Sequence, residues 1–323
     1  MELIAGDIGG TKSWLAWVTS TAEGEEKLRF EKVYASADFV SADALLKQYI
    51  TDAKVEAEPD ALWLALPGAL NEQRASLTNL AWTVDAAELR QTTGISTVRF
   101  INDFQAAAAG VATLNAQDMI VLNPQVAETG GVRAITGAGT GLGLAFMMAD
   151  ASGRYQSYPT EGGHIEFAPG NAQQRRLLEY LGATYAHVSW ERAVSGSAMN
   201  DLYRFCCIEQ GQALPDVAVE GAALVALAEA GNKMAEATLD LFIDLYGAWV
   251  GNVALLYQPR GGLFIAGGVA GHLQARMQSP RFMAAATDKG RMRSVVERTP
   301  IFLITCNRMG VQGVIASART SQT

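Results

Sequence analysis

The sequence predicts an α/β protein with two lobes, and three observations lead to this prediction. Apolar runs of strand length alternate with stretches of helical composition along most of the chain. The 323 residues exceed one typical domain. A strand, a glycine turn and a second strand follow one another twice, once near residue 6 and once near residue 137. We therefore expect one lobe over residues 1–105 and another over residues 106–304, with a cleft between them.

In the first lobe, five short apolar runs are expected to form one sheet: Leu3–Ala5, Trp14–Val18, Leu28–Val33, Leu62–Leu66 and Val98–Ile101. Helices are expected over residues 42–51 and 86–91, which fall between these runs. The second of these helices should begin at Asp85, which has the spacing of a capping box with Glu88. The alanine-rich run after Asp103 is expected to start a third helix.

The second lobe combines strands with a long helical region. Strands are expected over residues 119–122, 132–136 and 142–148, and the pattern is then mostly helical from residue 172 to about residue 257. The sheet pattern returns over residues 263–266 and 301–304. A last helix, over residues 308–318 within the segment 305–323, is expected to pack back on the first lobe.

Composition and charge exclude several classes of protein. The 25 Lys and Arg residues against 33 Asp and Glu residues give a net charge of −8, so no nucleic-acid partner is expected. The N-terminus lacks the pattern of a signal peptide, and residues 239–257 contain charged residues and glycines that a membrane span would exclude, so no membrane partner is expected. Cys206, Cys207 and Cys306 have neither disulfide nor metal-ligand spacing. We therefore expect a protein of the reducing cytoplasm.

The first glycine turn predicts a phosphate site. Its residues, which we take as candidate nucleotide contacts, are Gly6, Asp7, Ile8, Gly9, Gly10 and Thr11. Backbone N–H groups without neighbouring side chains can approach an anion, and the Thr11 hydroxyl adds a donor. The bulky residues that follow favour a second strand, so the turn should join two strands and not open a helix as a Walker loop does. Asp7 would repel phosphates unless Mg²⁺ lies between them. On its own, the hexapeptide equally fits a plain glycine-rich turn.

Two further glycine segments extend this pattern. The segment 137–143 lacks the third glycine of the dinucleotide fingerprint, and a strand follows it, so it suits a second loop around phosphates. The segment 264–271 follows a strand and suits the close approach of an adenine or a ribose, although a simple strand-to-helix turn also fits it. The candidate nucleotide contacts in these segments are Gly137, Gly139, Thr140, Gly267 and Gly268.

Polar residues at strand and helix ends are candidates for a second substrate. Asn102 and Asp103 follow a strand at the usual ligand-binding edge of an α/β sheet, although Asp103 also fits the N-cap of the next helix. Glu161 and His164 lie across two glycines, so both can point at one ligand. Glu191 precedes a serine-glycine segment and alternatively starts a helix. A metal site at His164 would lack the Cys and His density of a zinc centre, and none is expected.

Together these segments resemble the bacterial glucokinase family, over nearly the whole chain. The matching motifs occur in the family's order: Gly-Asp-x-Gly-Gly-Thr at 6–11, Ile-Asn-Asp-Phe at 101–104, Gly-Ala-Gly-Thr-Gly-Leu-Gly at 137–143, Glu-Gly-Gly-His at 161–164, Glu-Arg-x-x-Ser-Gly at 191–196 and Phe-Ile-Ala-Gly-Gly at 264–268. The resemblance implies the two-lobed, actin-like (ribonuclease H-like) ATPase fold with the active site in the interdomain cleft. It also implies ATP-dependent phosphorylation of glucose with Mg²⁺, by a homodimer.

The resemblance also assigns roles to the polar residues. It implies that Asp103 is the general base and that Asn102, Glu161, His164 and Glu191 hydrogen-bond the sugar hydroxyls. It implies that residues 6–11 hold the phosphates of ATP. The zinc-containing branch of related sugar kinases is disfavoured, since the three cysteines do not form its metal motif.

Two other functions fit the same scaffold. One is a kinase for another hexose or for an N-acetyl amino sugar, which turnover on a panel of sugars would separate from a glucokinase. The other is a non-catalytic sugar sensor or regulator, which would carry a basic helix-turn-helix extension that we do not expect here. An actin-like filament protein would not need Asn102, Glu161 and His164 near a nucleotide.

Overall fold

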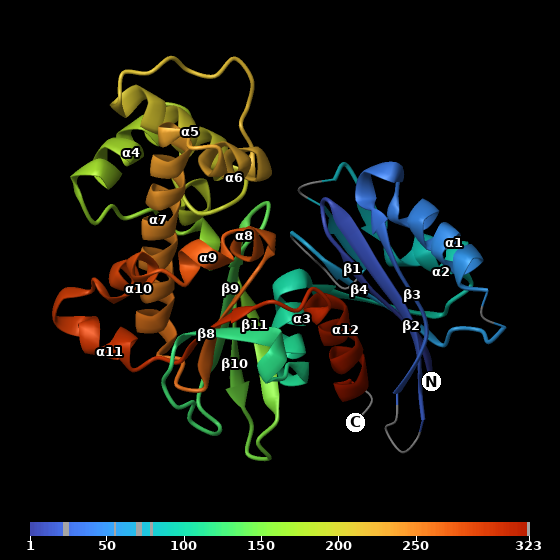
Figure 1. The fold of residues 1–323 in the computed structure, drawn as a ribbon. Coiled ribbons are helices and arrows are strands. Elements are labelled where there is room, and N and C mark those ends of the chain that lie inside the picture. Colours follow the sequence, from blue (N-terminus) through green and yellow to red (C-terminus); the bar gives the residue numbers. More distant parts are fainter. Residues whose placement is uncertain (22–25, 55, 69–72, 78–79, 322–323) are drawn as a thin grey trace. The chain divides into compact units, whose positions relative to one another are not determined.

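The computed structural model describes residues 1–21, 26–54, 56–68, 73–77 and 80–321 (Figure 1). The chain divides into two compact units: unit 1 contains Met1–Asn115 and Cys306–Thr323, and unit 2 contains Ala116–Thr305. The sequence places the first boundary near residue 105, inside helix α3 (Asp103–Gly110). The structure keeps α3 in unit 1 because α3 packs against α12 (Met309–Thr320), where Gly110 of α3 meets the backbone of Met309.

Unit 1 contains a five-stranded sheet in the order β3-β2-β1-β4-β7. Its strands are β1 (Glu2–Ile8), β2 (Lys12–Ser20), β3 (Glu26–Ala35), β4 (Ala61–Leu66) and β7 (Thr97–Asn102). Strand β1 pairs antiparallel with β2 and parallel with β4, which in turn pairs parallel with β7. The prediction that these five runs form one sheet is confirmed. A separate hairpin of β5 (Arg74–Ser76) and β6 (Thr83–Asp85) was not expected, because three-residue strands carry no periodic pattern.

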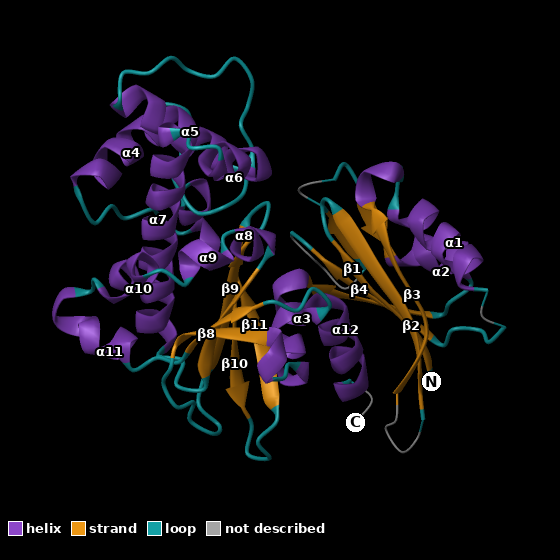
Figure 2. Cartoon of the chain, viewed as in Figure 1, coloured by secondary structure: helices purple, strands orange, loops and turns teal. Residues whose placement is uncertain are grey.

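Helices cover both faces of this sheet, so unit 1 has three layers (Figure 2). Alternation along β1 sends Ile4 and Ile8 into one apolar cluster with helix α1 (Ala42–Ala53) and helix α2 (Ala86–Thr93). Leu3 and Ala5 point to the opposite face, where the apolar residues of α12 cover them. As the capping pattern predicts, Asp85 is the N-cap of α2, and its carboxylate accepts hydrogen bonds from the Ala87 and Glu88 N–H groups.

Unit 2 contains a six-stranded sheet in the order β11-β10-β9-β12-β13-β8. Its strands are β8 (Met119–Asn123), β9 (Arg133–Ala138), β10 (Leu142–Ala149), β11 (Tyr155–Thr160), β12 (Gly262–Ala266) and β13 (Ile301–Ile304). All of them except β11 were predicted. Strand β11 contains Pro159, which argues against a central strand, and β11 is indeed at the edge of the sheet.

The helical part of unit 2 packs on one face of its sheet, around the long helix α7. The helices are α4 (Ala172–Gly182), α5 (Ala198–Glu209), α6 (Gly221–Glu229), α7 (Lys233–Tyr257), α8 (Gly268–His272), α9 (Gln274–Met277), α10 (Pro280–Thr287) and α11 (Arg293–Glu297). Trp249 and Tyr246 of α7 are fully buried in the cluster that joins these helices to the sheet. The short helices α9 to α11 had no counterpart among the predicted elements, whereas α8 begins where the sequence allowed a strand-to-helix turn.

Helix α7 is the one described helix that is long and apolar enough to cross a membrane. Of its most apolar window, 67% is buried inside the protein. Its apolar residues therefore contact protein, as expected for the central helix of a core.

Candidate active site

The first glycine turn joins two antiparallel strands, as predicted. Ile8 of β1 pairs with Ser13 of β2, and the Gly9 N–H donates to the Lys12 carbonyl at 2.9 Å. A neighbouring segment fixes the turn, because the Ser36 hydroxyl donates to the Gly9 carbonyl at 2.7 Å and the Ser36 N–H donates to the Thr11 carbonyl at 3.0 Å. Thr11 itself is exposed. The turn is thus held from one side while its tip faces solvent.

The six residues of the phosphate motif do not have equivalent environments. Gly6 is buried in the middle of β1, where a Cβ atom would lie 2.7 Å from the side chains of Leu15 and Leu64. Packing therefore accounts for Gly6 without a ligand. Gly9, Gly10 and Thr11 form the turn itself and remain the candidates for phosphate contact.

Two carboxylates meet at the carboxyl end of the parallel strands of unit 1. Asp7 is near the end of β1, and Asp103 follows β7 as the first residue of α3. Burial and, to a lesser extent, the negative charge of Asp103 together raise the pKa of Asp7 to about 7. The Asp7 carboxylate accepts no hydrogen bond from any residue that the structure describes. A cation bound between Asp7 and Asp103 would therefore stabilise their ionised forms.

The structure corrects one interpretation of this corner. The N-cap of α3 is Asn102 and not Asp103: the Asn102 side-chain oxygen accepts hydrogen bonds from the Phe104 N–H at 3.0 Å and from the Gln105 N–H at 3.1 Å. Because Asn102 caps the helix, the Asp103 carboxylate is not needed for that role, although one of its oxygens also contacts the Phe104 N–H at 2.9 Å.

The oxygen donors of Asp7 and Asp103 fit Mg²⁺, which binds through one or two carboxylates, water and substrate phosphates. Among the described residues, no three His, Cys, Asp or Glu side chains lie close enough together to hold a metal ion. A cation at this corner would thus depend on the phosphates of a nucleotide for further ligands. When bound, it would offset the repulsion that raises the pKa of Asp7.

In unit 2, the second glycine turn connects β9 to β10, also as predicted. Other elements hold this turn on several sides. The Ala138 N–H donates to the Tyr246 hydroxyl at 3.1 Å, and the Trp249 indole N–H donates to the Thr136 hydroxyl at 2.8 Å. The Gly139 carbonyl accepts from the Gly196 N–H at 2.8 Å. Gly139 and Thr140 lie at the tip, and a Cβ atom on Gly139 would contact nothing.

The Glu191 side chain contacts the backbone of this turn. Its carboxylate accepts a hydrogen bond from the Leu142 N–H at 2.9 Å, and Gly141 lacks the Cβ atom that would block this approach. The residue lies in a single 3-10 turn, Trp190–Arg192, so it does not start an α-helix. One carboxylate oxygen is occupied by the backbone, and the geometry leaves the other available to a ligand.

The third glycine segment is a strand-to-helix turn between β12 and α8. Gly267 has a φ of +94°, and a Cβ atom on it would strike the Ala138 carbonyl. Gly137 in turn faces the Ala266 backbone without room for a side chain. These glycines bring the second and third glycine segments into backbone contact. Gly268 is exposed with open space around it.

Glu161 and His164 come together as the sequence suggests. The Glu161 carboxylate lies 3.9 Å from the His164 ring, and both side chains are exposed. The Trp190 N–H donates to the Ile165 carbonyl at 3.0 Å, which ties this turn to the segment that carries Glu191. All three candidate sugar ligands of unit 2 therefore stand on two joined turns.

Sequence reasoning missed the residues that support these turns. His187, which showed no functional setting in the sequence, lies 2.8 Å from the His164 carbonyl through its ring nitrogen. Tyr246 and Trp249 are three residues apart on α7, and only their helical spacing hinted that they share one face. Nothing in the sequence indicated that Gly310 of α12 would contact the Asp7 carboxylate.

Comparisons with known proteins agree with this arrangement. A sequence model of the glucokinase family matches residues 4–321. The glucokinase of Trichormus variabilis is 36% identical over 337 aligned positions, which cover 98% of each chain. The glucokinase structure from an Antarctic psychrotroph superposes with a TM-score of 0.83 at 29% identity and 99% coverage of both chains. A ROK family glucokinase from Streptomyces griseus, solved with glucose and AMPPNP, shares the fold with a TM-score of 0.64 at 18% identity, over 99% of this chain and 100% of that chain.

The family match spans both units and includes every segment described above. The chain therefore has the two-lobed, actin-like ATPase fold and belongs to the glucokinase family of sugar kinases.

Proposed function

We propose that Asp103 is the general base in the reaction of this family, the ATP-dependent phosphorylation of glucose to glucose 6-phosphate. One observation carries the assignment: the Asp103 carboxylate is close enough to Asp7, beside the first glycine turn, to raise the pKa of Asp7. The base and the turn that would hold the phosphates thus share one edge of the unit 1 sheet.

Phosphoryl transfer requires no covalent intermediate with the protein. The glucose 6-hydroxyl attacks the γ-phosphorus, the bond from phosphorus to the β,γ-bridging oxygen breaks, and ADP leaves. The hydroxyl proton passes to Asp103 as the new bond forms. Alignment and neutralisation of charge on the phosphoryl oxygens account for most of the rate enhancement.

The phosphate contacts follow from the geometry of the turns. In unit 1 the N–H groups of Gly10 and Thr11 would bind phosphates of ATP, since the Gly9 N–H already donates to the Lys12 carbonyl. In unit 2 Thr140 would do so, and Gly139, whose N–H donates to the Gly141 carbonyl, would leave room for the phosphates because it has no side chain. Gly268, at the start of α8, would approach the adenosine. Mg²⁺ held near Asp7 would supply positive charge to the phosphates.

The sugar contacts come from polar groups left available within each unit. Asn102 offers its amide N–H₂ group, since its oxygen caps α3. Glu161, His164 and the second oxygen of Glu191 would accept or donate hydrogen bonds to the hydroxyls. A sugar with a misplaced hydroxyl would leave one of these groups unpaired, which is the physical basis for selecting glucose. By its family, we also propose that the protein acts in the cytoplasm as a homodimer.

The assignment of the base is tested by Asp103→Asn. We expect turnover to fall by about 10² or more while the glucose affinity changes by less than about tenfold, because the amide keeps the shape but accepts no proton. The matched control is Asp85→Asn, which exchanges the same groups at the N-cap of α2, where asparagine serves equally well. Unchanged turnover in Asp103→Asn would refute the assignment.

The placement of the sugar is tested by Glu161→Gln. The substitution removes one charged acceptor, so the KM for glucose should rise by about tenfold or more while the KM for ATP stays within about twofold. Glu166→Gln, at an exposed carboxylate five residues away, should change neither constant. An effect on ATP alone would mean that Glu161 faces the nucleotide.

A further inference from the structure

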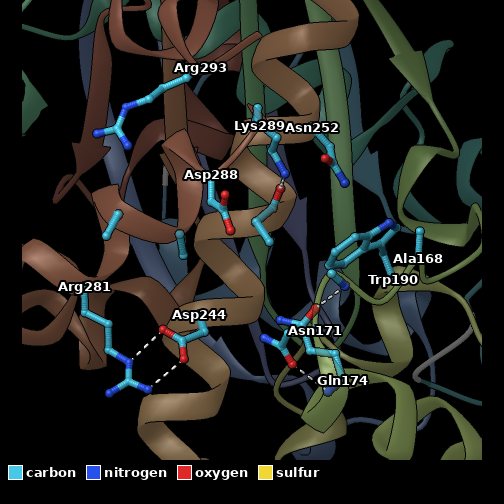
Figure 3. Close-up of a pocket in the computed structure, with 14 residues that line it drawn as sticks. Ala168, Asn171, Gln174, Trp190, Asp244, Asn252, Arg281, Asp288, Lys289 and Arg293 are labelled. Carbon is cyan, nitrogen blue, oxygen red and sulfur yellow. Dashed lines mark hydrogen bonds and ion pairs between the residues drawn. The ribbon is translucent and has the colours of Figure 1, made fainter. Parts of the chain in front are cut away.

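A cavity of about 520 Å³ opens in unit 2, between helix α7, helix α10 and the start of helix α4 (Figure 3). None of the residues assigned above to glucose or ATP lines it. Its polar walls come from Asn171, Gln174, Asp244, Asn252, Arg281 and Lys289, and Trp190 closes one side. The volume lies in the range of small-molecule sites and exceeds that of a hexose.

The hydrogen-bond acceptors at this cavity are largely used by the protein itself. The Gln174 side-chain oxygen accepts from the Gly170 N–H at 2.7 Å, and the Asn171 side-chain oxygen accepts from the Gln174 N–H at 2.9 Å. Both oxygens of Asp244 accept from the Arg281 guanidinium at 2.7 Å. Apart from Asn252, the side-chain acceptor that remains among the described lining residues is the exposed carboxylate of Asp288.

Several hydrogen-bond donors at the cavity, by contrast, have no partner among the described residues. Gln174 is 95% buried, and its amide nitrogen has no hydrogen-bond partner among the described residues although it lines the cavity. Lys289 donates one hydrogen bond, to the Ala248 carbonyl at 3.0 Å, which leaves two of its three protons free.

The Lys289 side chain is partly buried in the wall of the cavity and does not extend into solvent. Its stem lies over Gly251 of α7, where a Cβ atom would collide with the lysine Cε atom. Burial lowers the pKa of Lys289, which indicates that its ammonium group lacks sufficient compensating charge. A partly buried cation beside an unpaired amide calls for a ligand that is rich in acceptors.

We propose that this cavity is a second ligand site, separate from the active site, that binds the phosphate group of a small phosphorylated metabolite. A phosphate group offers acceptor oxygens in several directions at once, so the Gln174 amide and the Lys289 ammonium can each donate to it. The space left beside the phosphate accommodates a body of sugar size, which Asn252 can bind through either end of its amide.

Isothermal titration calorimetry on the full chain tests the site, with saturating glucose present so that the sugar site is filled. Inorganic phosphate and glucose 6-phosphate are titrated separately. We expect both to bind, and glucose 6-phosphate to bind more tightly if the sugar body also contacts the cavity. Tighter or equal binding of inorganic phosphate would identify the free anion as the ligand.

Two substitutions assign the binding to this cavity. Gln174→Glu keeps the acceptor for the Gly170 N–H but replaces the free donor by a carboxylate oxygen, and Lys289→Met keeps the stem over Gly251 but removes the charge. Each should weaken phosphate binding by about tenfold or more. The control Lys233→Met removes an exposed lysine at the start of α7 and should leave the affinity within about twofold.

Folding of each variant is checked by its thermal midpoint and by its turnover with glucose and ATP, which neither residue contacts in the proposed mechanism. The proposal is overturned if neither inorganic phosphate nor glucose 6-phosphate binds to the wild-type protein at concentrations up to about 10 mM. It is equally overturned if both variants, correctly folded, bind phosphate as tightly as the wild type.

Discussion

The two glycine turns of this protein look alike in sequence but are supported very differently. The turn between β1 and β2 is fixed from one side, by Ser36, and lies beside a carboxylate whose pKa is raised. The turn between β9 and β10 is bonded to Tyr246, Gly196 and Glu191, and its first glycine is pressed against β12. The first turn therefore lies next to a carboxylate that is unfavourable to ionise, whereas the second turn depends on tight backbone packing.

This difference teaches that glycine has separate roles within one motif. Some glycines are required because another backbone occupies the place of a side chain, and others leave an opening for a ligand. Gly137 is of the first kind, and Gly139, two residues later, is of the second. Substitutions at the two turns should separate stability from nucleotide binding.

The largest effect is expected at the packed turn. Gly137→Ala places a methyl group against the Ala266 carbonyl, which belongs to a strand and has no room to retreat, so the unfolding free energy should fall by about 3 kcal/mol. A drop of the thermal midpoint by about 5–10 °C would report this loss. Gly139→Ala is the matched control, since its methyl group meets no atom: the midpoint should stay within about 1 °C while the KM for ATP rises. Equal midpoints for the two variants would contradict the distinction.

At the first turn, the expected effect depends on pH. The pKa of Asp7 is raised from 3.8 to about 7, so the folded state holds this proton more tightly than the unfolded state does. The stability that this group contributes is complete below about pH 4 and is lost as the pH rises through 7. Asp7→Asn should remove this loss and stabilise the protein at pH 8 by about 1–2 kcal/mol, a figure reduced for the partial exposure of the group.

Thermal midpoints of wild type and Asp7→Asn between pH 5 and pH 8 measure this contribution as a difference of slopes. Addition of Mg²⁺ and an ATP analogue should narrow the gap at pH 8, since a cation favours ionised Asp7. Parallel pH curves for the two proteins would show that Asp7 is not strained by its surroundings.

An effect of similar size or smaller is expected at Ser36, whose side chain holds the first turn. Ser36→Ala removes the hydrogen bond to the Gly9 carbonyl and the one shared with the Ser13 hydroxyl, at 2.7 and 2.9 Å. Ser13 and Ser36 are fully buried and Gly9 is partly buried, so the cost should be about 1–2 kcal/mol, with an increase of a few-fold in the KM for ATP. Ser76→Ala, at an exposed serine of β5, should change neither quantity. A stable Ser36→Ala variant with unchanged KM would show that the turn needs no support.

Much of the fold could be predicted from the sequence because its elements carry local signals. The five strands of unit 1 are apolar runs between turn residues, and Asp85 caps its helix through contacts within three residues. The hairpin form of the first glycine turn followed from the bulky residues after it, and that of the second from the strand predicted to follow it. Strand β11 was missed because Pro159 is acceptable only at an edge, and the position of an edge is a property of the whole sheet.

The candidate site was predictable in its chemistry and not in its supports. Glu161 and His164 could be paired from their spacing, since two glycines separate them. The hydrogen bond from the Leu142 N–H to Glu191 joins residues 49 positions apart, and Gly310 and Asp7 are about 300 positions apart. No local sequence pattern can predict either contact. Asn102 was assigned to the sugar while its oxygen also caps α3, a double use that spacing alone does not reveal.

The return of α12 to unit 1 determines the order in which the nascent protein can mature. Val311, Val314 and Ile315 cover the face of the sheet that carries Leu3 and Ala5. These three residues leave the ribosome only after all of unit 2 has been synthesised. Unit 2 can fold during translation. The sheet of unit 1 that bears Asp7 and Asp103, in contrast, has one apolar face that α12 cannot cover until the end of the chain has been synthesised. Chaperone demand should therefore fall on the first part of the chain to be made.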